Sequence, residues 1–196
     1  MKKTQKILIG VVLLTILLGI GAGASALLSP REGYMPYQPI FFQHKKMAAK
    51  PNWVTGEDGK EVNMGGYDIP CIYCHTMPYK GRHSTLPSTD ICMNCHSTVG
   101  QDKEWVLKLL EYWDAGKPIQ WVKVHDLPDF AYYDHSAHLN VVDENGKLKL
   151  DCVDCHGEVE NTEMVSVQNR FNMGWCLDCH RKPDMNASID CYICHR

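Results

Sequence analysis

The sequence has no cysteine outside paired motifs and no excess of positive charge. Its ten cysteines form five Cys-x-x-Cys pairs, so none is left over for an ordinary disulfide. The formal net charge is −3, and the only charged residues before position 29 are three lysines, so the rest of the chain is more acidic by three charges. A protein of this charge is not expected to bind nucleic acid. The chemistry of the chain therefore lies in the cysteine pairs.

A histidine follows the second cysteine of every pair. Cys-x-x-Cys-His motifs attach c-type haem, because two thiols add to the two vinyl groups of one porphyrin and the histidine binds the iron. Zinc ribbons and thiol redox enzymes also use Cys-x-x-Cys pairs, but neither needs a histidine after every pair. The sequence thus predicts five haem c groups. The attachment cysteines and proximal histidines are Cys71, Cys74 and His75; Cys92, Cys95 and His96; Cys152, Cys155 and His156; Cys176, Cys179 and His180; and Cys191, Cys194 and His195.

The chain is short for five cofactors. A domain of about 150 residues normally buries one continuous apolar core, whereas here the haems are expected to form the core. We therefore predict a multihaem cytochrome c fold that is mostly coil, with short α-helices and little sheet, preceded by one N-terminal transmembrane helix. The expected parts are a membrane anchor at 1–28, a linker with the first distal-ligand segment at 29–70, and a pentahaem cytochrome domain at 71–196.

Three local elements are predicted within the exported part. Aromatic and apolar residues at helical spacing, followed by Gly116, indicate a helix over 102–115. Weak alternation favours a short strand over 119–124, and Asn145-Gly146 between two apolar segments is a hairpin signal.

The N-terminal segment is expected to anchor the chain. Residues 7–28 are mostly apolar, carry no charge and are long enough to span a bilayer. Lys2, Lys3 and Lys6 precede them, and positive residues stay inside, so we expect a single-pass protein of the cytoplasmic membrane with its haem domain on the periplasmic face. The alternative is a cleaved signal peptide, because Ala24-Ser25-Ala26 resembles a cleavage site.

Five further histidines match the five motifs in number. They are His44, His83, His125, His135 and His138. A six-coordinate haem needs one distal ligand, and two histidines three residues apart, such as His135 and His138, share one face of a helix. Methionine is the rival distal ligand and raises the potential of a haem, with Met173 and Met164 as the candidates. We expect mostly bis-histidine haems, with one His/Met site as the alternative.

Six-coordinate haems have no open position for a substrate, so they transfer electrons. Pentahaem nitrite reductases open one haem with a lysine in place of the motif histidine, and no Cys-x-x-Cys-Lys occurs here. The chain is therefore expected to relay electrons and not to be catalytic alone. Two alternatives stay open: a free-standing membrane-anchored quinol dehydrogenase, and a multihaem reductase.

Six stretches of the chain carry a family resemblance. They are PIFFQHK at 39–45, ICMNCH at 91–96, WVKVHDLPDF at 121–130, DHSAH at 134–138, CVDCHG at 152–157 and MGWCLDCH at 173–180. They resemble the pentahaem cytochrome subunit of bacterial alternative complex III, a quinol:electron-acceptor oxidoreductase. The resemblance implies an electron-transfer subunit of a membrane quinol-oxidising respiratory or photosynthetic complex that reduces a cytochrome c or another periplasmic acceptor. It also implies an iron–sulfur protein, integral membrane quinol-binding subunits and a monohaem cytochrome c as partners.

Overall fold

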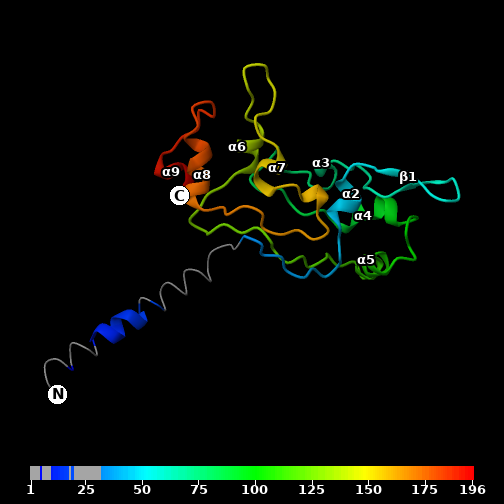
Figure 1. The fold of residues 1–196 in the computed structure, drawn as a ribbon, viewed down its shortest axis with the longest axis horizontal. Helices are drawn as coiled ribbons and strands as arrows, with labels where there is room; N and C mark the ends of the chain where they lie inside the picture. Colours follow the sequence, from blue (N-terminus) through cyan, green and yellow to red (C-terminus); the bar gives the residue numbers. More distant parts are fainter. Residues whose placement is uncertain (1–4, 6–9, 18, 20–31) are drawn as a thin grey trace. The chain divides into compact units, whose positions relative to one another are not determined.

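The computed structural model describes residue 5, residues 10–17, residue 19 and residues 32–196 (Figure 1). The chain divides into two units, Met1–Arg31 and Glu32–Arg196. In the first unit, residues 10–17 are helical. The predicted anchor at 1–28 and the signal-peptide alternative fall mostly outside the described residues. No helix within the described residues is both long enough and apolar enough to cross a membrane.

The second unit is mostly coil, with short helices and one two-stranded sheet. Its elements in chain order are helix α2 (His44–Ala48), strands β1 (Trp53–Thr55) and β2 (Glu61–Asn63), helices α3 (Cys71–Cys74), α4 (Thr89–His96), α5 (Glu104–Asp114), α6 (His135–Leu139) and α7 (Cys152–His156), the 3-10 helix η1 (Val159–Asn161), and helices α8 (Met173–His180) and α9 (Cys191–Cys194). Each cysteine pair lies on a short helix of its own: α3, α4, α7, α8 or α9. The spacing of three residues then puts both thiols of a pair on one helix face.

Helix α5 confirms the helix predicted over 102–115. It packs against α4, and Leu109 is its buried residue. Trp105 of α5 also contacts the N-terminal part of the second unit. Its ring centroid lies 5.8 Å from that of Phe41. Gly116, one residue beyond the C-cap, has φ 60°, a conformation that favours glycine and ends the helix.

The strand predicted over 119–124 is wrong, because these residues are coil. The backbone N–H of Val122 donates to Oε1 of Gln38 at 2.8 Å, and Nε2 of Gln38 donates to the carbonyl of Val122 at 2.9 Å. A side chain from far along the sequence thus satisfies the backbone groups that a neighbouring strand would have paired.

The predicted hairpin turn at Asn145-Gly146 is confirmed by an antiparallel bridge between Val142 and Leu148. Oδ1 of Asp143 accepts from the backbone N–H of Asn145 at 2.8 Å and stabilises the turn. Figure 1 shows the hairpin as a long loop that projects away from α6 and α7.

A second hairpin lies inside the segment expected to be a linker. β1 and β2 are antiparallel, with Val54 paired to Val62. The turn contains Asp58-Gly59, with φ 76° at Gly59, and Asp-Gly is a typical hairpin turn. Gly66 then brings the chain back against α2 so closely that a Cβ there would overlap the carbonyl oxygen of Ala49. Asp58-Gly59 is a sequence signal for this hairpin, which the sequence prediction missed.

The second unit has little apolar core of its own. The buried hydrophobic residues within the described part of the chain are Ile40, Ala49, Leu109, Leu139 and Val167. Large exposed apolar residues include those between the cysteines of three motifs: Ile72, Tyr73, Val153, Tyr192 and Ile193. A self-contained domain of this size would bury about two thirds of its chain surface. The exposed apolar side chains around the motifs are therefore surfaces that large apolar cofactors could cover.

Candidate haem sites

Four of the five motif histidines make the same hydrogen bond to a backbone carbonyl. Nδ1 of His75 lies 2.8 Å from the oxygen of Thr85, that of His96 3.0 Å from Val99, that of His180 2.7 Å from Ser188 and that of His195 3.0 Å from Phe130. A metal-binding histidine typically donates its second ring N–H to a carbonyl, which fixes the ring and leaves the other nitrogen for the metal. With Nδ1 donating, Nε2 stays available for iron, so these residues fit haem.

His156, the fifth motif histidine, lies among other imidazoles. No hydrogen bond within the described residues holds its ring. The centroid of its ring is 4.6 Å from that of His125 and 6.4 Å from that of His135. Burial, together with the nearby rings of His125, His135 and His75, lowers the pKa of His156 to about 4. The ring is therefore neutral, which is the form that binds a metal.

Helix α6 presents the two histidines that were expected to share a face. It begins at His135 because Oδ1 of Asp134 accepts from the backbone N–H of Ser136 at 2.9 Å and caps the helix. Nδ1 of His135 lies 2.8 Å from the carbonyl of Arg82, and Nδ1 of His138 lies 2.8 Å from the carbonyl of Asp134. Both rings thus repeat the arrangement of the motif histidines and leave Nε2 available.

Each histidine of α6 lies across from a motif histidine. The ring centroids are 6.4 Å apart for His135 and His156, and 6.0 Å apart for His138 and His180. Two imidazoles on opposite sides of one iron have centroids about 6 Å apart, given metal–nitrogen bonds of about 2.0 Å and about 1.1 Å from nitrogen to ring centre. Both pairs therefore fit bis-histidine ligation. His125 lies too close to His156 for that arrangement, so His135 is better placed.

The ring of Tyr133 contacts both histidines of α6. The centroid of its ring lies 4.5 Å from that of His138 and 4.8 Å from that of His135. Burial raises its pKa, and the thiols of Cys155 and Cys176 add to the effect, so its hydroxyl stays protonated. The sequence prediction missed this residue, although its position two residues before His135 was a signal.

His44 and His125 are half-buried and carry unsatisfied ring nitrogens. Nδ1 of His44 and Nε2 of His125 are buried without a hydrogen-bond partner. Burial lowers the pKa of His125, and burial together with His75 lowers that of His44 to about 4. A buried polar atom without a partner costs about 1–3 kcal/mol. An iron ligated by Nε2 would remove this cost at His125.

Three other candidate ligands have less support. His83 is exposed, and no hydrogen bond or ring contact among the described residues involves it. Met173 is the first residue of α8, with 66% of its surface exposed. Met164 is half-buried in coil after η1. Ligation by these three residues stays a prediction.

The second motif lies next to the first, and the first next to the third. Nδ2 of Asn94, inside the second motif, donates to the hydroxyl of Tyr73, inside the first, at 3.1 Å. Burial raises the pKa of Cys152 in the third motif to about 12, and the neighbouring Cys71 thiol of the first motif contributes. The first motif therefore stands between the second and the third.

The remaining motifs continue this series. Burial raises the pKa of Cys155 in the third motif to about 11, with further contributions from Asp154 and from Cys179 and Cys176 of the fourth. Burial, then the Cys194 thiol of the fifth motif, raises the pKa of Cys176. The motifs thus follow one another in the spatial order second, first, third, fourth and fifth, which differs from their order in the chain.

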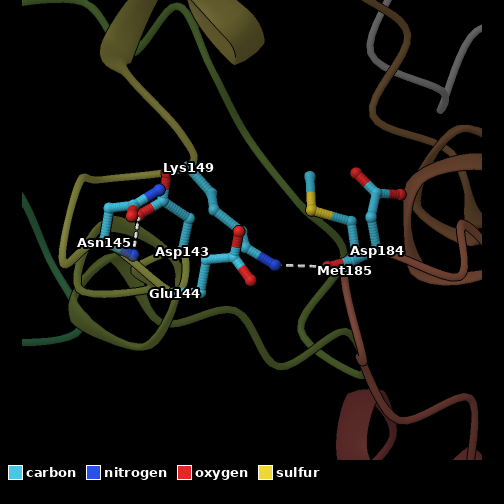
Figure 2. A pocket seen from close by; sticks show the side chains of 6 residues that line it. All are labelled: Asp143, Glu144, Asn145, Lys149, Asp184 and Met185. Carbon is cyan, nitrogen blue, oxygen red and sulfur yellow. Dashed lines mark hydrogen bonds between the residues drawn. The ribbon is translucent and has the colours of Figure 1, made fainter.

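One cavity of about 440 Å³ lies beside the projecting hairpin (Figure 2). Its lining residues are Asp143, Glu144, Asn145, Lys149, Asp184 and Met185. Figure 2 shows the ammonium group of Lys149 donating to the backbone carbonyl of Asp184, which ties the hairpin to the segment after α8. Neither cysteine nor histidine is among these residues, so the cavity is separate from the haem motifs.

No family model matches the sequence. The chain is similar to the multihaem cytochrome c subunit of a menaquinone reductase from Nitratidesulfovibrio vulgaris. The two are 27% identical over 178 residues, which cover 81% of this chain and 77% of the relative. The relative is described as a multihaem cytochrome c, and this supports the interpretation of the Cys-x-x-Cys-His motifs as haem sites.

Proposed function

We propose that this chain is the electron-transfer subunit of a quinone-linked membrane oxidoreductase and relays electrons through five haem c groups. The observation that carries the proposal is the set of five Cys-x-x-Cys-His motifs, each of which lies next to another. Each bound haem would supply a one-electron couple. The relative's similarity over four fifths of the chain adds independent support.

The chain's own residues would hold the cofactors and exclude substrates. The paired cysteines of each motif would form the two thioether bonds, and the motif histidine would bind the iron through Nε2. His135 and His138 would close the sixth positions of the haems at the third and fourth motifs, as their ring distances to His156 and His180 allow. Two iron sites closed in this way would support electron relay at these haems and disfavour a reductase site there.

Two directions of electron flow are candidates. The resemblance to the alternative complex III cytochrome supports quinol oxidation, with an iron–sulfur protein, membrane quinol-binding subunits and a monohaem cytochrome c as partners. The name of the relative favours the second candidate, menaquinone reduction. In both cases we propose that the N-terminal segment anchors the chain in the cytoplasmic membrane and that the haem domain lies on the periplasmic side.

Purification of the tagged chain from its native membrane tests this function. We expect large membrane partners to co-purify, and five haems per chain in a pyridine haemochrome assay. The complex is then given menaquinol with oxidised cytochrome c as the acceptor, and, in a separate assay, menaquinone with a low-potential donor such as reduced methyl viologen. The reaction that the complex catalyses identifies the direction. Quinol oxidation by the isolated chain would support a free-standing dehydrogenase instead, and a count clearly below five would contradict the proposal.

A further inference from the structure

Two arginine side chains stack on one tyrosine ring beside the fifth motif. Cζ of Arg82 lies 4.4 Å from the ring centroid of Tyr132, and Cζ of Arg196 lies 4.3 Å from it. Contacts of this kind hold a guanidinium group against an aromatic face. We call these three residues the arginine–tyrosine stack. It brings together residues from segments that are far apart in the sequence.

Backbone hydrogen bonds fix the arginine–tyrosine stack next to the fifth motif. The N–H of Tyr132 donates to the carbonyl of Cys194 at 2.6 Å. Nε of Arg82 donates to the carbonyl of Tyr133 at 3.0 Å. Arg196 directly follows the motif histidine. The two positive charges are therefore held beside one particular haem motif.

Neither guanidinium has an acidic partner among the described residues. The ion pairs found in that part of the chain all involve lysines. Apart from Nε of Arg82, no side-chain nitrogen of either arginine makes a hydrogen bond with a described residue. Two like charges on one ring repel each other, and an anion between them would relieve the repulsion. The planar guanidinium matches a carboxylate with two parallel hydrogen bonds.

We propose that the arginine–tyrosine stack binds a carboxylate of the haem attached at Cys191 and Cys194, that is, one of its propionates, and thereby raises the reduction potential of that haem. The proposal rests on haem attachment at the fifth motif, which is part of the proposed function. Oxidised haem carries one more positive charge than reduced haem, so nearby positive charge favours the reduced form. Because the fifth motif is at one end of the series, the stack would set the potential of a terminal haem.

The double variant Arg82→Gln/Arg196→Gln tests this inference in the full-length chain. A redox titration followed in the haem absorption bands is resolved into five midpoint potentials. We expect one midpoint to fall by the equivalent of a tenfold change in its redox equilibrium, about 59 mV for one electron, while the other four change less. The matched control is Arg181→Gln, because Arg181 also follows a motif histidine directly but makes no ring contact among the described residues.

Further variants separate loss of charge from loss of fold. Haem content is measured first for every variant. Arg82→Lys/Arg196→Lys keeps both charges, so its midpoint potentials should stay close to those of the wild-type protein. If the double variant does not retain five haems, the single variant Arg196→Gln decides, with a smaller fall of the same midpoint expected.

Several outcomes would overturn the inference. Unchanged midpoints in a variant that retains five haems would do so. Unchanged midpoints with a weaker ionic-strength dependence of electron transfer to a protein partner would assign the stack to docking instead. A wild-type chain that binds no haem at the fifth motif would contradict the proposed function, which is a separate failure.

Discussion

Replacement of His138 by alanine should open the iron of one haem in five. The ring of His138 lies 6.0 Å from that of His180, as expected for two imidazoles on one iron. The neighbouring ring of His135 cannot replace it, because its Nδ1 is held by the carbonyl of Arg82 and its ring faces His156. His138→Ala should therefore convert the haem at the fourth motif to a five-coordinate, high-spin state.

The size of the effect follows from the number of motifs. Near-infrared magnetic circular dichroism of the oxidised protein should lose about one fifth of its bis-histidine signal. Carbon monoxide should then bind one haem per reduced chain. His138→Met should keep this haem six-coordinate and raise its potential, because a thioether ligand favours the reduced form. Ala137→Gln, an exposed change on the same helix, serves as the control and should leave the spectrum unchanged.

A fully low-spin His138→Ala protein with five unchanged potentials would refute this reasoning. It would mean that the pairing of His138 with His180 does not survive haem insertion. The iron at the fourth motif would then have another distal ligand, and Met173 on the same helix α8 would be the first residue to replace.

Three further changes test the local structure by denaturant unfolding of the haem-loaded protein. Gly66→Ala should destabilise the protein by about 2–3 kcal/mol, because the new Cβ overlaps the backbone at α2. The control Gly81→Ala has open space around the site and should have little effect. Equal stability of the two variants would argue against the close approach. Asp134→Ala removes the cap of α6 and should cost about 1 kcal/mol, and no loss would show that α6 does not depend on its cap. Gln38→Ala leaves the backbone of Val122 unpaired and should cost about 1 kcal/mol; a neutral result would mean that water replaces the amide.

The sequence predicts which histidines share a helix better than it predicts which rings lie across from them. His135 and His138 are three residues apart, so a shared helix face follows from local geometry alone. Their distances to His156 and His180 depend on how coil segments fold back across the unit, and no local pattern encodes that. The order of the motifs in space cannot be predicted from a local pattern either, because the second motif comes before the first in that order. It results from contacts such as that between Asn94 and Tyr73.

The wrong strand prediction has the same kind of cause. Residues 119–124 have a strand-like alternation, but the side chain of Gln38 takes the hydrogen bonds of Val122. Such a contact across much of the chain is not visible in a short window. By contrast, the hairpin at Asp58-Gly59 was readable from its turn residues, and the hairpin at Asn145-Gly146 was predicted from the same type of signal.

The small size of α6 has a consequence for how the protein matures. A helix of five residues is not stable by itself, so α6 depends on what its two histidines bind. If those ligands are two irons, the helix becomes fixed at both points only after the third and fourth motifs have each received a haem. A half-loaded chain would leave α6 and the adjoining hairpin held on one side, and this segment would be the first open to proteases. Copies with every haem inserted would then resist proteolysis and persist, whereas incompletely loaded copies would be degraded.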